Sequence, residues 1–164
     1  MNLNIMIGLP GSGKSTFANK EIEEWNDGVW ISRDEIRFSL LEDGQTYFAN
    51  ETAVFNFFIQ EVQKVIDEGT KDVYVDDTHV NSASRFKVLN RLNLENIEEI
   101  CYFFFDTPIE ECKRRNRKRE GLAKVPEKAI DNMAATAQFY ITPDEERIYS
   151  PTEFHVDFKG ELSV

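Results

Sequence analysis

The sequence predicts an α/β fold in which a mostly parallel, five-stranded sheet is flanked by helices. Short apolar segments alternate along the chain with longer segments of helical periodicity, which is the pattern of repeated strand–helix units. Residues 100–105 are all apolar, as expected for a parallel strand that is covered on both faces. Residues 3–7 form another apolar strand, which runs directly into a glycine-rich turn and a helix.

Local signals define the individual elements. Phe17, Ala18 and Ile22 recur at helical spacing after the first strand. Ser32 begins a further helix, with Glu35 in capping-box position three residues later. We expect strands at 3–7, 29–31, 73–75, 100–105 and 153–158, helices at 14–25, 32–41, 50–68, 82–92, 108–120 and 126–139, a turn at Gly28, and a loop between Pro143 and Pro151.

Length and composition indicate one ordinary domain, residues 1–164, with 41% hydrophobic residues. No apolar run reaches the roughly 18 residues that span a bilayer, and no signal peptide precedes the first strand. We therefore expect a cytoplasmic protein without a membrane partner. Cys101 and Cys112 have no metal-type spacing and are expected to pack as small apolar residues.

The chain is strongly acidic, with a net charge of −11 and one basic segment. An acidic protein repels polyanions on average, which argues against an extensive nucleic-acid interface. Residues 113–119 read Lys-Arg-Arg-Asn-Arg-Lys-Arg, with six cations in seven positions. This segment predicts a local anion site, and a solvated helix end is the alternative.

The strongest motif is Gly8-Leu-Pro-Gly-Ser-Gly-Lys-Ser-Thr16, which fits the pattern of a phosphate-binding P-loop (Walker A). Its glycines let backbone N–H groups point at phosphate oxygens. Lys14 can reach the β- and γ-phosphates, and the Ser15 hydroxyl can hold Mg²⁺. The motif predicts a P-loop NTPase fold that binds ATP and Mg²⁺, with a simple glycine-rich turn as the alternative. We assign nucleotide binding to Gly8, Pro10, Gly11, Ser12, Gly13, Lys14, Ser15 and Thr16.

Polar residues also follow other strands, at the sheet edge where ligands bind in such folds. Asp34 and Arg37 are three residues apart on one helix face. An acid there can accept the proton of an attacking hydroxyl, and an arginine can hold an acceptor phosphate. Asp76 and Asp77 end a buried strand, where an aspartate can reach Mg²⁺ directly or through water. We assign the metal to Ser15 and Asp77. A surface ion pair is the alternative for Asp34 and Arg37, and helix capping or loop polarity is the alternative for Asp76 and Asp77.

Arg115 and Arg119 lie one helical turn apart, just before Gly121. This arrangement predicts a lid, at about residues 113–126, that closes over a triphosphate and stabilises transition-state charge. His79 and His155 have no partner at a recognised metal-ligand spacing, so we expect both to be structural.

Four segments together resemble the kinase domain of phage-type polynucleotide 5′-hydroxyl kinases. They are the P-loop, Ser32-Arg-Asp-Glu-Ile-Arg37, Asp77-Thr-His-Val-Asn81, and the run from Phe105-Asp-Thr-Pro through Arg119 to Lys124-Val-Pro126. Their order and approximate spacing match over most of residues 1–140. His79 stands where asparagine is typical of the family. The resemblance implies a sheet like that of adenylate kinase, with a short lid.

The resemblance also implies roles for matching residues. On the donor side, Lys14 and Ser15 would bind the phosphates and Mg²⁺, while Arg115 and Arg119 would clamp ATP. On the acceptor side, Asp34 would be the general base for the 5′-hydroxyl, and Arg37 would contact the acceptor's phosphate and the reacting centre. Asp77 and Thr78 would line the acceptor pocket. The implied catalytic residues are Lys14, Asp34, Arg37, Arg115 and Arg119.

We therefore expect an ATP- and Mg²⁺-dependent kinase that transfers the γ-phosphoryl group to a hydroxyl. The favoured acceptor is the 5′-hydroxyl end of DNA or RNA. A small hydroxylated substrate handled by the same residues is one alternative, and a nucleotide-binding regulatory ATPase is another. Asp34 and the basic lid favour transfer over regulation.

Overall fold

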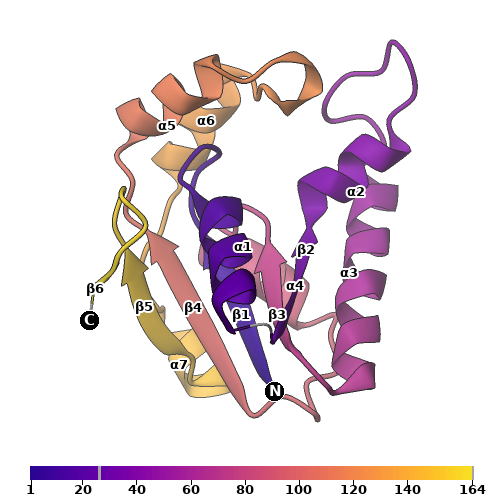
Figure 1. The fold of residues 1–164 in the computed structure, drawn as a ribbon, viewed down its shortest axis with the longest axis vertical. Helices are drawn as coiled ribbons and strands as arrows, with labels where there is room; N and C mark the ends of the chain where they lie inside the picture. The colour runs from indigo at the N-terminus through magenta and orange to yellow at the C-terminus, as the bar shows by residue number, and fades with distance from the viewer. Residues whose placement is uncertain (26, 164) are drawn as a thin grey trace.

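The computed structural model describes residues 1–25 and 27–163, and it confirms the α/β prediction. The strand order in the sheet is β2-β3-β1-β4-β5-β6 (Figure 1). Neighbouring strands from β2 to β5 are parallel, and β6 pairs with β5 in the antiparallel direction. The strands are β1 (Asn2–Ile7), β2 (Gly28–Ser32), β3 (Asp72–Asp76), β4 (Glu99–Phe105), β5 (Thr152–Val156) and β6 (Leu162–Ser163).

The central strand β1 sets the register of the site. Met6, near its carboxyl end, is paired with Asp76 of β3 on one side and with Phe103 of β4 on the other. Ser32, the last residue of β2, is paired with the same Asp76. The segments that follow β1, β2 and β3 therefore start at one edge of the sheet, as predicted.

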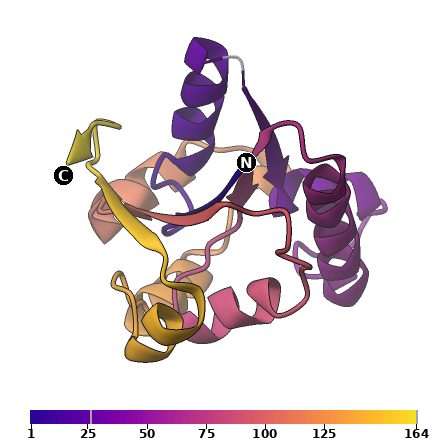
Figure 2. The same cartoon turned by 90° about the horizontal axis from the view of Figure 1, so that it is seen from below.

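Helices cover both faces of the sheet. In Figure 2, α1 lies on one face, and α3, α4 and α7 lie on the other. In Figure 1, α2, α5 and α6 lie above the carboxyl ends of the strands. The helices are α1 (Lys14–Trp25), α2 (Arg33–Leu40), α3 (Glu51–Glu68), α4 (Ser82–Leu89), α5 (Ile109–Arg117), α6 (Glu127–Ala135) and α7 (Pro143–Tyr149), with a 3₁₀ turn at Gly121–Ala123.

Alternate residues of the central strands pack into two cores. Leu3 and Ile5 are buried with Phe58 and Val62 of α3. On the opposite face, Met6 is buried with Phe17 of α1 and with aromatic residues of β4. The two cores explain why β4 is apolar at every position after Glu99 and β1 is apolar from Ile5 to Ile7, since side chains of a strand alternate between the faces. Cys101 and Cys112 are both buried and unbridged, which agrees with their predicted packing role.

Several predicted boundaries were wrong. The described sheet has six strands, not five, because the chain turns back after β5 to add the two-residue strand β6. The predicted loop between Pro143 and Pro151 contains helix α7 instead. Thr142 and Glu145 form a reciprocal capping box there, and Pro143 occupies the first turn, where its missing N–H costs nothing. Gly28 begins β2 and is not a turn residue.

Helices α4, α5 and α6 end three or four residues earlier than their sequence patterns predicted, at Leu89, Arg117 and Ala135. None of the helices in the described part of the chain is long and apolar enough to cross a membrane.

Candidate active site

Residues 8–13 form a tight loop between β1 and α1 that is tied to both neighbouring strand ends. The Gly8 N–H donates to the Thr78 carbonyl oxygen at 2.9 Å, and the Thr107 hydroxyl donates to the Ser12 carbonyl oxygen at 2.8 Å. Gly11 has φ +84°, and a Cβ atom there would lie 2.6 Å from the Cys112 carbonyl oxygen. Only glycine fits at this position, because both the dihedral and the approach of α5 exclude a side chain.

The loop leaves polar groups free for an anion. The Ser12 hydroxyl is buried without a hydrogen-bond partner among the described residues. Lys14 is 7% exposed, and its Nζ donates to the carbonyl oxygens of Gly8 and Leu9 at 3.0 and 3.1 Å. Buried polar groups in native structures are normally paired. An orphaned hydroxyl at the N-terminus of α1 therefore fits a bound phosphate, whose oxygens accept such bonds.

Ser15 and Asp76 form the part of the site that suits a divalent cation. The Ser15 hydroxyl donates to Asp76 Oδ2 at 2.6 Å, and the Trp30 indole N–H donates to the same oxygen at 3.0 Å. Burial raises the pKa of Asp76, although nearby Lys14 opposes this. A buried carboxylate beside a hydroxyl offers the oxygen ligands that Mg²⁺ prefers, with water and phosphate oxygens completing the shell.

Asp77 has different partners from Asp76, because successive residues at the end of a strand point in opposite directions. Arg33 donates to Asp77 Oδ2 at 2.7 Å, and the Thr78 N–H donates to Oδ1 at 2.7 Å. Burial acts to raise the pKa of Asp77, but the Arg33 guanidinium outweighs it and holds that pKa well below its usual range. Asp77 is therefore a fixed anion paired with Arg33, one residue away from the Ser15 contact.

Asp34 and Arg37 lie together, as their spacing predicted, within a larger polar cluster. Arg37 is 4% exposed, so the arginine of this pair is buried, whereas the Asp34 side chain is partly exposed. Its Nε donates to Glu51 Oε1 at 2.8 Å, and its Nη1 donates to Asp34 Oδ1. The Tyr47 hydroxyl also donates to Asp34 Oδ1, at 2.7 Å. Glu51 begins α3, so the packing of α3 against α2 holds the arginine in place.

A cavity of about 340 Å³ joins the P-loop to this cluster. The segment between α2 and α3 rises on one side of it, and the segment between α5 and α6 rises on the other (Figure 1). Its lining includes nine of the predicted site residues together with an aromatic side. The predicted ones are Pro10, Gly11, Lys14, Ser15, Asp34, Arg37, Asp77, Thr78 and Arg119, and the aromatic ones are Trp30, Phe38, Tyr47 and Phe48.

A second cavity, of about 360 Å³, lies beside the other flank of the P-loop. Arg115 Nη1 donates to the Gly11 carbonyl oxygen at 3.3 Å, and its Nη2 donates to the Phe158 carbonyl oxygen at 2.7 Å. Arg115 thus links α5, the P-loop and the turn between β5 and β6. Arg119 lines both cavities. The second lining consists of Gly11, Ser12, Gly13, Thr16, Phe17, Lys20, Phe105, Arg115, Arg119, Phe158, Lys159 and Gly160.

The two histidines have different surroundings. His79 is 1% exposed, and burial lowers its pKa to about 4. His155 lies between carboxylates of Asp106 and Glu153, at 2.7 and 2.8 Å. Among the described residues, no group of three or more His, Cys, Asp or Glu side chains could hold a metal ion.

Sequence reasoning missed several residues of the site. Tyr47, Phe48 and Glu51 belong to no motif, and they reach the cavity only because the segment after α2 folds back over it. Phe158 lies beyond the predicted lid, but its carbonyl oxygen accepts a hydrogen bond from the lid residue Arg115. The one available signal was the cluster of three aromatic residues, Phe38, Tyr47 and Phe48, around a turn where exposed polar residues are usual.

Known proteins resemble this chain in sequence and in fold. The family model described as AAA domain matches residues 3–140. An adenylyl-sulfate kinase of Pseudomonas aeruginosa is 31% identical over 149 residues, which cover 87% of this chain and 72% of that protein.

Solved structures also resemble this chain in fold. A chain of the Pnkp1/Rnl/Hen1 RNA repair complex superposes with a TM-score of 0.68 and 26% identity, over 82% of this chain. This chain corresponds to only 43% of that one. A sugar kinase from Janibacter has the same fold, with a TM-score of 0.62 and 19% identity over 98% of this chain and 86% of the other. The chain therefore belongs to the AAA domain family and is a P-loop kinase.

Proposed function

We propose that this kinase transfers the γ-phosphoryl group of ATP to a hydroxyl held at Asp34, and that the favoured acceptor is the 5′-hydroxyl end of DNA or RNA. One observation carries the proposal. A single cavity is lined both by Lys14 and Ser15 of the P-loop and by the carboxylate of Asp34. Holding donor and acceptor groups in one orientation is the main way in which such enzymes accelerate phosphoryl transfer.

Each side chain has a defined task in this reaction. Asp34 accepts the proton of the attacking hydroxyl, while Lys14 and Arg119 offset the negative charge of the phosphates. Mg²⁺, when bound, neutralises charge that develops on the phosphate oxygens. We propose Ser15 and Asp76 as its protein ligands, in place of the predicted Ser15 and Asp77, because Asp76 contacts the Ser15 hydroxyl whereas Asp77 is paired with Arg33.

The second cavity is proposed to hold the base and ribose of the donor. It shares the P-loop with the first cavity and is closed by Arg115 and by the turn that carries Phe158. A nucleotide whose phosphates lie in the loop can then extend away from Asp34. Donor and acceptor would approach the reacting phosphate from opposite sides, as an in-line displacement requires.

The aromatic residues beside Asp34 support a nucleic-acid end as the acceptor. Tyr47 and Phe48 are in edge contact, with ring centroids 4.7 Å apart, and Phe48 is 45% exposed at the cavity. Exposed aromatic rings bind the faces of unpaired bases. The net charge of −11 disfavours contact with a long duplex. An acceptor that inserts only its terminal nucleotide satisfies both observations, and the likeness to a chain of an RNA repair complex supports it.

A small hydroxylated molecule is the second candidate, favoured by a specific observation. Arg33 and Arg37, the arginines beside the acceptor position, already share the carboxylate of Glu51. An acceptor phosphate would have to compete with this carboxylate, whereas an uncharged acceptor would not. The 31% identity to an adenylyl-sulfate kinase is in keeping with a small acceptor.

The test is a transfer assay with γ-labelled ATP and Mg²⁺. The acceptors offered are 5′-hydroxyl DNA and RNA oligonucleotides, free nucleosides and small alcohols. Label in the oligonucleotides supports the favoured acceptor, and label in small molecules alone supports the second candidate. Release of free phosphate without any labelled acceptor would refute the proposal and support a regulatory ATPase.

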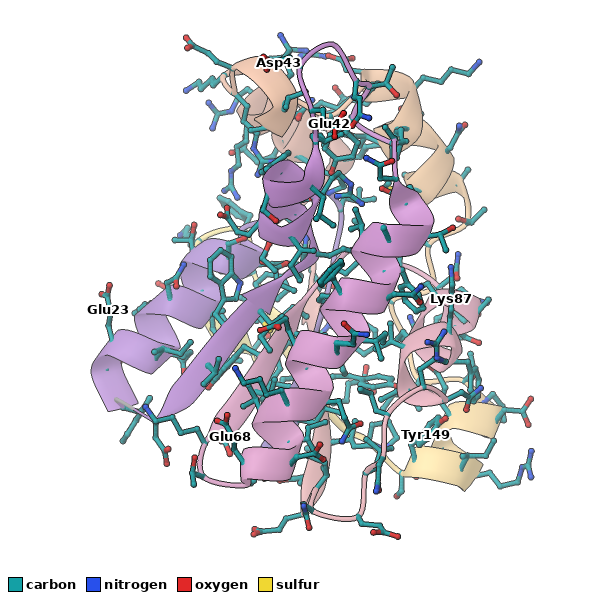
Figure 3. All side chains as sticks on the ribbon, turned by 90° about the vertical axis from the view of Figure 1, so that its right-hand side faces the viewer. Glu23, Glu42, Asp43, Glu68, Lys87 and Tyr149 are labelled. Atoms are coloured by element: carbon teal, nitrogen blue, oxygen red, sulfur yellow. The ribbon has the colours of Figure 1, made fainter. Side chains whose placement is uncertain are left out.

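Asp34→Asn tests the proposed base. It should lower transfer by about 100-fold or more, because a positioned general base contributes roughly 10² to 10⁴ in rate, while ATP affinity stays near that of the wild type. Asp43→Asn is the matched control, because Asp43 lies at the exposed tip of the segment between α2 and α3 (Figure 3). Equal transfer rates for the two variants would remove Asp34 from the mechanism.

A further inference from the structure

We propose that Tyr47 is a positioning residue, which fixes the Asp34 carboxylate in the orientation that proton transfer requires. The inference rests on the proposed function, in which Asp34 accepts the proton of the acceptor hydroxyl. Tyr47 lies between α2 and α3 and belongs to no sequence motif. Its role follows from its contacts with Asp34 and Arg37.

The first observation is a closed ring of hydrogen bonds. The Tyr47 hydroxyl donates to Asp34 Oδ1 at 2.7 Å and accepts from Arg37 Nη1 at 3.0 Å. Arg37 Nη1 also donates to the same Asp34 oxygen. A phenol has a single proton to donate. Burial and the adjacent charge of Asp34 keep that proton in place, because both raise the pKa of Tyr47.

The second observation concerns which oxygen of the Asp34 carboxylate accepts these hydrogen bonds. Within the described part of the chain, both donors contact Oδ1 of Asp34, which leaves Oδ2 to accept the proton of a substrate hydroxyl. The Asp34 side chain is 44% exposed, whereas that of Arg37 is 5% exposed. Packing therefore holds the arginine but not the carboxylate. The orientation of Asp34 depends on hydrogen bonds, and Tyr47 supplies one of the two.

The third observation is that the Tyr47 ring makes packing contacts that do not involve its hydroxyl. The Arg37 guanidinium lies over this ring, 4.5 Å from its centroid. Phe38 and Phe48 contact it edge-on, at centroid distances of 6.3 and 4.7 Å. A phenylalanine at position 47 keeps all of these ring contacts and loses only the hydroxyl. Tyr47→Phe therefore separates positioning of the carboxylate from packing of the segment.

The test is steady-state transfer by Tyr47→Phe, using the 5′-hydroxyl oligonucleotide, nucleoside or alcohol that the wild type labels best. We expect kcat to fall about tenfold, since a misoriented base loses part of its roughly 10² to 10⁴ contribution. KM for ATP and for the acceptor should change less than about twofold, and the unfolding midpoint should not move. Tyr140→Phe is the control, because Tyr140 is 53% exposed and lies outside both cavities.

A double-mutant cycle gives a result that a purely structural role would not produce. Adding Tyr47→Phe to Asp34→Asn should slow transfer no further if the hydroxyl acts through the carboxylate and not through its contact with Arg37. A wild-type kcat in Tyr47→Phe would overturn the inference. So would an equal fall in transfer rate when Tyr47→Phe is introduced into the wild type and into Asp34→Asn. Unchanged transfer in Asp34→Asn alone would instead refute the proposed function, so the two failures are distinguishable.

Discussion

Acid is expected to destabilise this protein through one buried side chain, His79. Burial lowers its pKa from 6.5 to about 4 in the folded state. The unfolded chain therefore takes up a proton first as the pH falls, so the folded state loses stability between pH 6.5 and pH 4. A difference of roughly 2.5 pKa units, at 1.36 kcal/mol per unit, corresponds to about 3 kcal/mol at the acid end. The contribution is absent above pH 6.5, where His79 is neutral in both states.

Urea unfolding of the wild type and of His79→Asn, at intervals from pH 7.5 to pH 4, measures the stability that is lost through His79. Asparagine tolerates the left-handed backbone at position 79, where φ is +45°, and it does not titrate. Relative to the wild type, the free energy of unfolding of the variant should rise by about 3 kcal/mol between pH 7.5 and pH 4. Parallel pH profiles would refute the reasoning.

His155 provides a control of opposite sign within the same chain. Burial tends to lower its pKa, but hydrogen bonds to Glu153 and Asp106 outweigh this and raise it. Its contribution to stability is therefore fully present below pH 6.5 and is lost as the pH rises through the folded-state pKa. His155→Asn should lose stability relative to the wild type mainly at low pH, the reverse of His79→Asn.

Two further predictions concern the acceptor side and the core. Phe48→Ala should raise the acceptor KM about tenfold if a base stacks there, because such stacking is worth about 1–3 kcal/mol. Phe57→Ala, equally exposed but outside both cavities, should leave steady-state kinetics unchanged, and equal KM values for the two variants would exclude stacking at position 48. Arg85→Met should cost about 3–5 kcal/mol in urea unfolding, because it leaves the fully buried Glu145 carboxylate without its ion pair. The double variant with Glu145→Leu should recover part of that loss, and wild-type stability of the single variant would contradict this account.

The sequence predicted five of the six described strands because their signals are local. Continuous apolar runs such as 100–105, and helix stops such as Gly69 directly after the predicted helix 50–68, need no tertiary information to be recognised. Helix α7 was missed because its seven residues begin at Pro143, end two residues before Pro151, and carry little apolar periodicity. Its stability comes from a tertiary contact, since the buried Glu145 in its first turn pairs with Arg85 of α4.

Prediction of the site was limited for the same physical reason. Residues at strand ends, such as Asp34 and Asp77, converge because parallel strands end at one edge, and the sequence gives that directly. Tyr47 lies 13 positions after its partner Asp34, and Glu51 lies 14 positions after its partner Arg37. Each contact forms only because α3 packs on α2. The choice between Asp76 and Asp77 depends on which way each side chain points after the last paired residue of β3. Residue spacing in the sequence determines neither the packing of α3 on α2 nor the direction of these two side chains.

The pairing of the cationic side chains explains how such an acidic chain can hold a polyanion. Arg33 and Arg37 are neutralised by Asp77, Asp34 and Glu51, so they position groups and add little net attraction. Lys14, in contrast, donates only to carbonyl oxygens in the contacts that the structure describes. A triphosphate can take over those bonds without breaking an ion pair. In the proposed function, attraction of the donor is thus concentrated at the P-loop, while the acceptor half of the cavity selects by shape and hydrogen bonding. Added salt should accordingly weaken donor binding more than acceptor binding, because only the donor relies on uncompensated charge.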